Sequence, residues 1–409
     1  MDFFLEIWQT ISKNRSRSFL TAFGVFWGML MLIVLLGGGN VLTHMFMKET
    51  DGISSNAGIM WSQPTSMPYA GFQTGRSWDI RNEDIEAIRE KVNSVEAIAP
   101  CITGGTMTVS HGALHHDYSV EGITPDLRLA ENIKVELGRD ISEMDLMENR
   151  KVCVIGSQVR KVIFPNDENP IGQYILCGSM YVQVVGVLKE ATSDATSSAN
   201  EQVHMPLTTL QHMLQKGDEI HYMHIVSRHD VPAEQTLEQV ATVLKQRHQI
   251  APDDKKAVGY FDMSSIFKVL NIITMGIYAL IWLIGLGTLI SGAVGVSNIM
   301  LVTVRERTKE IGVRRAIGAS PWLIARQILA ESVTLTAMAG VMGIMTGVIV
   351  LDIVERVLAQ METEVGSIQV SLDIAIVSLV VIILVGALAG LMPALRALKI
   401  KPIEALNEE

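Results

Sequence analysis

Four long apolar stretches, separated by polar chain, dominate the pattern of hydrophobic and polar positions. They contain no charged side chain and cover residues 18–43, 269–304, 332–351 and 374–395. A helix of about 20 such residues crosses a bilayer. We therefore predict four transmembrane helices, at 18–43, 269–304, 321–351 with an approach helix after Pro321, and 374–395 with a break near Pro393. The second stretch would be about 54 Å long as a helix, so we expect it to continue beyond the membrane as a stalk.

Charged residues at the ends of these stretches predict the topology. Residues 1–17 combine an apolar helical stripe with three basic side chains, which is typical of a cytoplasmic interfacial helix. Basic residues also gather at 305–320 and in the tail, 396–409. Because basic loops favour the cytoplasm, we expect both termini and the 305–320 loop inside, and 44–268 and the short loop 352–373 outside. A cleaved signal peptide is the alternative at the N-terminus, but its apolar region would be shorter and no A-x-A site follows.

The segment 44–268 has the alternating and periodic patterns of a water-soluble α+β domain. We expect helices over 77–92 and 233–249, strands over 95–102, 151–156, 181–188 and 221–228, a hairpin over 106–122 that turns near Gly112, and a Ser/Thr-rich loop over 191–200. The fold class predicted is thus an α-helical membrane protein with four transmembrane helices and a large α+β extracytoplasmic domain between helices 1 and 2.

Composition agrees with this division and excludes some functions. Hydrophobic residues make up 48% and charged residues 19% of the 409 positions, and the mean hydropathy is +0.30. The net charge is −10, which argues against nucleic-acid binding. The three cysteines, Cys101, Cys153 and Cys177, cannot all pair with one another, and whether any two form a disulfide stays open.

The short loop between the second and third apolar stretches has helical character of its own. Glu306 and Glu310 are four residues apart and share a helix face, Ile311 and Ile317 are expected to form an apolar stripe, and Gly312 and Gly318 limit the helix length. One interpretation is a topogenic signal alone. The other is a docking helix, in which the two acids pair with residues of a partner protein.

Residues 298–319, N-I-M-L-V-T-V-R-E-R-T-K-E-I-G-V-R-R-A-I-G-A, resemble the corresponding loop of MacB-type ABC permeases, a group that includes LolC/LolE and FtsX. The resemblance implies that 305–320 is the coupling helix that contacts an ATPase. The coupling residues would be Arg305, Glu306, Arg307, Thr308, Lys309, Glu310, Ile311, Gly312, Arg314, Arg315 and Gly318.

Shorter motifs extend the resemblance over the rest of the chain. They are G-R-D-I-S at 138–142, V-C-V-I-G-S at 152–157, P-I-G at 170–172, V-V-G-V-L at 184–188 and the C-terminal G-L-M-P-A-L-R-A-L-K-I-K-P-I-E-A-L at 390–406. In the family a porter subdomain carries an inserted, β-rich Sabre subdomain. The resemblance implies such an insertion at about 101–200.

The sequence offers little sign of chemistry. It contains no G-x-x-x-x-G-K-[ST] motif, so we expect ATP and Mg²⁺ to be bound by a separate ATPase polypeptide, and this chain to bind no cofactor and to be no enzyme. His111, His115 and His116 lie close together, but no cysteine or carboxylate spacing completes a metal site. The apolar stretches lack ionisable residues at mid-depth, which argues against a secondary transporter.

The function expected is that of a permease subunit in a bacterial inner membrane, with its large domain in the periplasm. It would transmit ATP-driven motion to that domain and drive export of substrates from the periplasm or the outer membrane leaflet. Expected partners are the ATPase, a second permease chain (identical or paralogous), membrane lipids, and a membrane-fusion protein with an outer-membrane duct. Lipoprotein release, as in LolC/LolE, and FtsX-like regulation of cell-wall hydrolases are the alternatives. Gly343 and Gly347 form a small-xxx-small pair, which serves packing either within the chain or between two chains.

Overall fold

The computed structural model describes residues 15–49, 52, 54–165, 169–193, 196–360 and 372–400. The chain divides into two compact units, Met1–Met45 with Ile272–Glu409, and Phe46–Asn271. We call them the helical unit and the outer unit. Parts of three predicted segments lie outside the described residues: 1–14 of the interfacial helix, 361–371 of the short loop and 401–409 of the tail.

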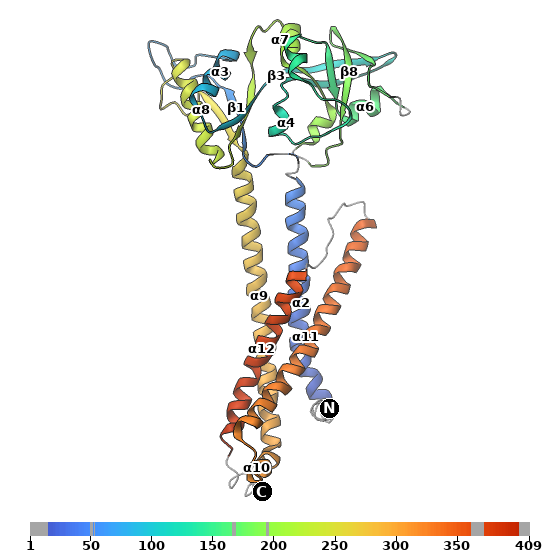
Figure 1. The fold of residues 1–409 in the computed structure, drawn as a ribbon, viewed down its shortest axis with the longest axis vertical. Coiled ribbons are helices and arrows are strands. Elements are labelled where there is room, and N and C mark those ends of the chain that lie inside the picture. Colours follow the sequence, from blue (N-terminus) through green and yellow to red (C-terminus); the bar gives the residue numbers. More distant parts are fainter. Residues whose placement is uncertain are drawn as a thin grey trace. The chain divides into compact units, whose positions relative to one another are not determined.

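Five helices shape the helical unit (Figure 1): α2 (Arg15–Glu49), α9 (Met263–Glu306), α10 (Thr308–Ala316), α11 (Pro321–Gln360) and α12 (Leu372–Leu398). Among the described residues, four helices are long and apolar enough to cross a membrane, and they come from α2, α9, α11 and α12. Helix α9 is continuous over 44 residues, about 66 Å at the usual rise. The predicted class, four apolar helices with an α/β domain after the first, is confirmed.

Two details of the helical unit differ from prediction. Helix α11 continues to Gln360, so 352–360 is helical and not part of a loop. Helix α12 passes through Pro393 and ends at Leu398. Proline removes a backbone donor and usually kinks or ends a helix. Here Ala394 and Ala397, 2% and 1% exposed, pack with Ile311 and Ile324, and this packing stabilises the turn after the proline.

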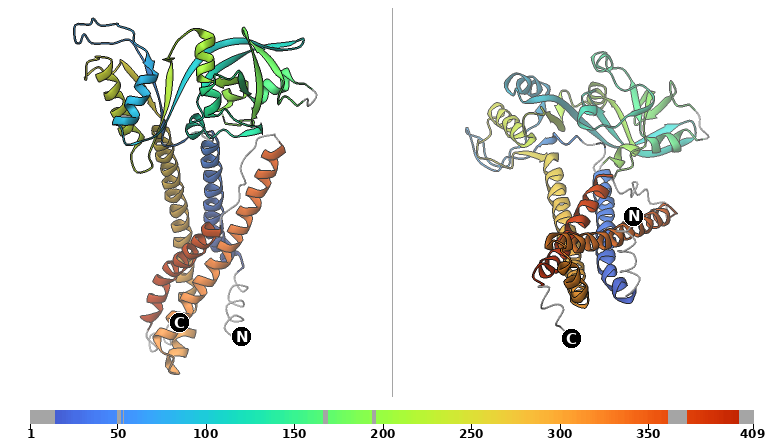
Figure 2. Two further views of the ribbon diagram at one scale, coloured as in Figure 1. Left: turned by 45° about the horizontal axis from the view of Figure 1, so that its top comes forward. Right: turned by 60° about the horizontal axis from the view of Figure 1, so that its bottom comes forward.

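Glycines allow the helices to pack closely within the chain. A Cβ on Gly343 would lie 2.7 Å from the carbonyl oxygen of Phe26, and one on Gly347 would lie 2.8 Å from Ile33 Cγ2. The small-xxx-small pair therefore packs α11 against α2 of the same chain. Helices α11 and α12 cross and pack against each other (Figure 2), and Ser332 Oγ donates a hydrogen bond to the Gly386 carbonyl (3.0 Å).

The outer unit is built on a 10-stranded mixed sheet with strand order β12-β1-β11-β3-β4-β9-β6-β8-β5, in which β7 pairs with β3 and β8. The strands are β1 (Ala57–Ser62), β3 (Val95–His111), β4 (Leu114–Ile123), β5 (Val135–Gly138), β6 (Val152–Ile155), β7 (Tyr174–Cys177), β8 (Met180–Leu188), β9 (Gln202–Pro206), β11 (Tyr222–Ser227) and β12 (Val258–Asp262). A second sheet pairs β2 (Ile80–Arg81) with β10 (Glu219–Ile220). The helices are α3 (Asn82–Lys91), α4 (Leu127–Ala130), α5 (Glu143–Met147), α6 (Ser157–Ile163), α7 (Leu207–Leu214), α8 (Ala233–Arg247) and the 3-10 helix η1 (Ser197–Glu201).

The long strand β3 connects two hydrophobic cores. Its first half contributes Ile98 to a core formed with α3 and α8, whereas its second half contributes Val109 to a core formed with α6 and α7. Between the two halves the register with β4 shifts, and Gly105 takes a φ of +71° that favours glycine. This bulge lets one strand serve both cores.

Most predicted elements of the outer unit exist, but the helix expected over 77–92 begins five residues later. Residues Ile80–Arg81 form β2. Asp84 accepts a hydrogen bond from the Arg81 backbone N–H (2.9 Å) and thereby fixes the helix start. The predicted hairpin is confirmed, since His111 pairs with Leu114 around Gly112. All three cysteines are buried free thiols.

Candidate functional site

Helix α10 is held against the ends of three longer helices by one apolar face. Ile311 is 8% exposed and lies in a core with Val304 of α9, Ile328 of α11 and Ala397 of α12. Gly312 is also buried. A short isolated helix would be marginal in water, so this burial accounts for the order of α10.

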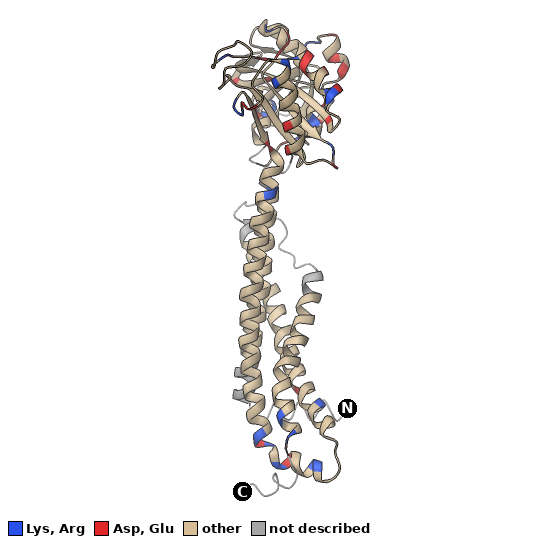
Figure 3. Cartoon of the chain, turned by 90° about the vertical axis from the view of Figure 1, so that its left-hand side faces the viewer, with Lys and Arg blue, Asp and Glu red and all other residues tan. Residues whose placement is uncertain are grey.

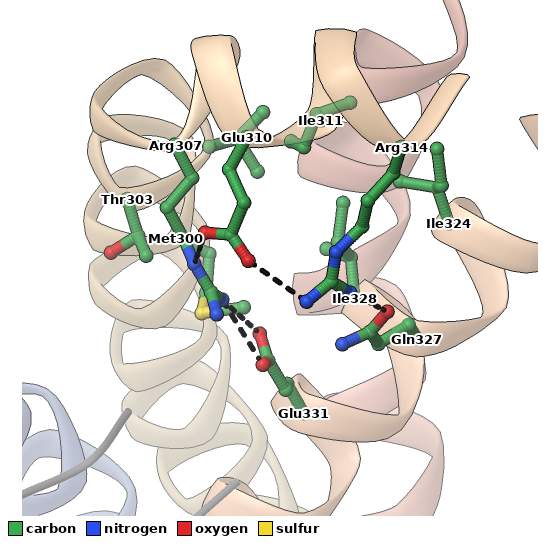
Figure 4. Close-up of a pocket in the computed structure, with 11 residues that line it drawn as sticks. Met300, Thr303, Arg307, Glu310, Ile311, Arg314, Ile324, Gln327, Ile328 and Glu331 are labelled. Atoms are coloured by element: carbon green, nitrogen blue, oxygen red, sulfur yellow. Dashed lines mark hydrogen bonds and ion pairs between the residues drawn. The ribbon is translucent and has the colours of Figure 1, made fainter. Parts of the chain in front are cut away.

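A polar network next to Ile311 also fixes the helix (Figure 4). Glu310 pairs with Arg314 (2.8 Å) and Arg307 (3.3 Å), and Arg307 pairs with Glu331 of α11 (3.2 Å). Arg314 Nη1 also donates to Gln327 Oε1 (3.2 Å). The Glu331 side chain is only 8% exposed, so Arg307 neutralises a carboxylate that has been removed from water.

A third set of contacts connects α10 to the end of α12. Arg315 donates hydrogen bonds to the carbonyl oxygens of Leu398 and Ile400. The last carbonyls of a helix have no partner within it, and an arginine there also suits the helix dipole. Since α10 is tied to both α11 and α12, it is expected to move with them as one body.

The predicted coupling residues thus fall into two groups. Glu310, Arg307, Arg314, Arg315, Ile311 and Gly312 bind α10 to its own chain. Arg305, Glu306, Lys309 and Gly318 are exposed, and Thr308 Oγ1 donates to the Arg305 carbonyl (2.7 Å). The docking interpretation expected Glu310 to pair with a partner protein; in the structure Glu310 pairs with Arg314 of α10 and with Arg307 just before it.

Apolar side chains exposed at the turn between α10 and α11 were not anticipated as a group. They are Val313 (43% exposed), Ile317 (82%), Trp322 (73%) and Leu323 (54%), and we call them the turn surface. Ile317 was expected to share a stripe with Ile311. The two are six residues apart, about one and two-thirds turns, so one is buried and the other faces out. The four-residue spacing of Val313 and Ile317 was the available signal.

The arrangement suits recognition of another protein. Many charged residues of the helical unit lie at the end that carries α10 (Figure 3). The same end exposes the apolar residues of the turn surface, and exposed apolar surfaces of this kind mark protein contacts. Across the part of the chain that the structure describes, no group of three or more His, Cys, Asp or Glu side chains is arranged to hold a metal ion.

Comparison with known proteins identifies related sequences for both units. Residues 18–243 match the family described as MacB-like periplasmic core domain, and residues 265–402 match FtsX-like permease C-terminal. The chain is 27% identical over 402 residues to the macrolide export ATP-binding/permease protein MacB of Bdellovibrio bacteriovorus, covering 98% of this chain and 61% of that protein. It is 30% identical over 411 residues to the pyoverdine export ATP-binding/permease protein PvdT of Pseudomonas syringae pv. tomato. This match covers 100% of this chain and 60% of PvdT.

Among solved structures, the chain is similar to the periplasmic region of MacB from Actinobacillus actinomycetemcomitans, with 19% identity and a TM-score of 0.44, covering 55% of this chain and 97% of that one. The chain is also similar to the extracellular domain of the noncanonic ABC-type transporter YknZ from Gram-positive bacteria, with 18% identity and a TM-score of 0.42. This match covers 50% of this chain and 100% of the YknZ domain. The chain spans about three fifths of the length of the curated relatives named above.

Proposed function

The chain belongs to the permease family that combines a MacB-like periplasmic core domain with an FtsX-like C-terminal region, and on this premise we propose that it is the permease component of an ABC exporter. The four apolar helices and the MacB-like domain fit an inner-membrane protein with a periplasmic domain. The ATPase of the proposed exporter lies outside these 409 residues, which contain no phosphate-binding loop. ATP and Mg²⁺ would bind there.

The observation that carries the proposal is the construction of α10. Its inner face is fixed by Ile311 and by the ion pair from Arg307 to Glu331, while Ile317 is 82% exposed. A helix that is rigidly attached on its inner face, and that exposes both charged and apolar side chains on its outer face, can receive force from a docked protein. Motion of the ATPase would pass through α10 to α11, α12 and α9.

Mechanotransmission to the periplasmic side is the mode of action we favour. The predicted spans carry no ionisable residue at mid-depth, so a hydrophilic route through one chain has little support. The work would be done on the outer unit, and export would start from the periplasm. The relatives MacB and PvdT are named as export proteins, which supports export over the FtsX-like regulatory alternative. Lipoprotein release is the second candidate, favoured by the same coupling helix.

A second permease chain completes the proposed transporter. Helix α9 leaves large apolar side chains exposed, among them Ile272 (69%), Met275 (73%) and Leu283 (70%). In a membrane, lipid would cover part of this apolar surface. Packing of α9 against α9 of a second chain would cover more of it. Membrane-fusion and outer-membrane duct proteins are further partners of the export hypothesis.

Affinity purification of the tagged full-length chain from its own membranes tests the proposal. We expect an ABC ATPase to co-purify and to hydrolyse ATP only while bound to a functional membrane complex. The chain purified free of that subunit should not hydrolyse ATP. Recovery of the chain without any ATPase, or ATP turnover by the chain alone, would contradict the proposal.

A further inference from the structure

The outer unit contains a cavity of about 250 Å³ that the transport proposal does not use. Its walls include Ile59 of β1, Glu121 of β4, Glu131 after α4, and Tyr222 and His224 of β11. Several waters would fit in this volume. The walls are mainly apolar, but two carboxylates and an imidazole line the same space, which is the composition of a small-molecule site.

Glu121 is held in place by neutral donors. Tyr222 Oη donates to Glu121 Oε2 (2.9 Å), and Gln202 Nε2 donates to Glu121 Oε1 (3.4 Å). Burial raises the pKa of the Glu121 carboxyl above its usual value, while the Tyr222 hydrogen bond lowers it. Within the described part of the chain, no lysine or arginine forms an ion pair with this carboxylate.

Arg128, whose charge acts on Glu131, makes its hydrogen bonds to other residues, and its buried Nη1 has no hydrogen-bond partner among the described residues. Arg128 Nε donates to Asp140 Oδ2 (2.7 Å), and Arg128 Nη2 lies 3.2 Å from His204 Nδ1. Its charge lowers the pKa of Glu131, but burial is the larger effect and raises that pKa to about 7. The cavity therefore holds two partly buried carboxylates, with the Glu131 side chain 28% exposed, and neither forms an ion pair with a lysine or arginine of the described residues.

His224 adds a nitrogen acceptor to the polar lining of the cavity. Its side chain is 7% exposed, it lines the cavity, and its Nε2 lies 3.8 Å from Glu131 Oε1, which is beyond hydrogen-bond distance. Among the described residues, nothing hydrogen-bonds to its ring nitrogens. Burial lowers its pKa to about 4, so the ring is neutral near pH 7 and one of its nitrogens can accept a hydrogen bond.

We propose that this cavity binds a small organic cation whose primary ammonium group donates hydrogen bonds to Glu131, Glu121 and His224. An ammonium has three donors and no acceptor, which matches three acceptors around one space. The organic part would contact Ile59 and Ile133. A metal ion fits less well, since the described His, Asp and Glu side chains form no ligand cluster. The site goes beyond the proposed function, because it gives the outer unit a ligand of its own.

Benzylammonium is a suitable probe, because its aromatic protons are separate from detergent signals in ligand-observed NMR. The full-length chain in detergent would be titrated at pH 8 with benzylammonium, benzyl alcohol and benzoate. We expect saturable benzylammonium binding that Glu131→Gln weakens at least about tenfold. Glu136→Gln is the matched control, since Glu136 is exposed on β5 and does not line the cavity.

Glu121→Gln keeps the test decisive if Glu131→Gln fails to fold. It should also weaken benzylammonium binding, and neither variant should change the weak partitioning of benzyl alcohol. At pH 7 the binding heat should depend on the ionisation enthalpy of the buffer, because Glu131 must release a proton to receive the cation. Equal benzylammonium binding by the wild type and a folded Glu131→Gln or Glu121→Gln variant, or equal binding of benzyl alcohol and benzylammonium by the wild type, would overturn the proposal.

Discussion

At the scale of single residues, the ion pair between Arg307 and Glu331 links the start of α10 to α11. The side chains are 26% and 8% exposed, and the nitrogen and oxygen lie 3.2 Å apart. A buried pair is a weak source of net stability, but an isolated buried charge is strongly unfavourable. The two residues should therefore be energetically coupled.

We predict that Arg307→Met destabilises the chain more than the double variant Arg307→Met/Glu331→Gln. The coupling energy should be roughly 1–3 kcal/mol, as for other contacting charged pairs. A double-mutant cycle measured by denaturant unfolding of the helical unit, followed by helical circular dichroism, gives this value. Strictly additive effects would show that the pair contributes no coupling.

Glu131 makes a prediction about pH in the outer unit. Its pKa is raised from 4.5 to about 7 by burial, so between these values the folded chain holds a proton that the unfolded chain has released. Stability is therefore lost as the pH rises through this window. Glu131→Gln should gain stability over the wild type at pH 8 relative to pH 5, by about 1.4 kcal/mol per pH unit of the shift. Urea unfolding of both proteins at the two pH values tests this, and a pH-independent difference would contradict it.

At the scale of elements, the sequence predicted what depends on local pattern. The apolar runs predicted α2, α9, α11 and α12, and turn chemistry predicted the hairpin at Gly112. Elements that depend on distant contacts were mispredicted. The helix expected from Ser77 starts at Asn82, because the chain before it pairs with β10.

The candidate site shows the same limit. A helix at 305–320 and its two glycines could be read from the sequence, and α10 indeed ends before Gly318, whose φ is +106°. The pairing of Arg307 with Glu331 could not be predicted from the sequence, because Glu331 is 24 residues further along the chain. Pro393 was expected to end α12, but packing of the following turn outweighs the loss of one backbone donor.

The close packing of α11 against α2 at Gly343 gives a prediction about stability. Gly343→Ala should destabilise the helical unit, because the new Cβ would lie 2.7 Å from the Phe26 carbonyl oxygen. Gly295→Ala is the control, since its Cβ would meet no described atom within 4 Å, and alanine favours a helix over glycine by about 1 kcal/mol. Denaturation of the two purified variants compares them. Equal stability would contradict the packing of α11 against α2.

At the scale of the whole molecule, the topology can be measured by cysteine labelling. Ser179→Cys lies in an exposed turn of the outer unit, and Ala316→Cys is exposed at the end of α10. A membrane-impermeant maleimide should label the first in cells with a permeable outer membrane, and the second only after the inner membrane is opened. The native thiols are each 0% exposed, so the unmodified chain serves as the unlabelled control. The reverse pattern would contradict a periplasmic outer unit.

Docking of an ATPase on the turn surface is the central claim of the proposed function. Ile317→Asp replaces a side chain that is 82% exposed and should leave the fold intact. Met147→Asp is the matched control, since Met147 is 75% exposed on the outer unit. An Asp at a docked apolar position would be buried without a partner and should weaken binding by several kcal/mol.

The most direct measurement is the affinity of the purified ATPase for the wild type, Ile317→Asp and Met147→Asp chains in nanodiscs, together with ATP hydrolysis in each complex. We predict that Ile317→Asp loses ATPase binding and coupled hydrolysis at least about tenfold, while Met147→Asp matches the wild type. If Ile317→Asp inserts, folds and binds the ATPase as tightly as the wild type, then the turn surface is not the docking site and the account of coupling through α10 is wrong.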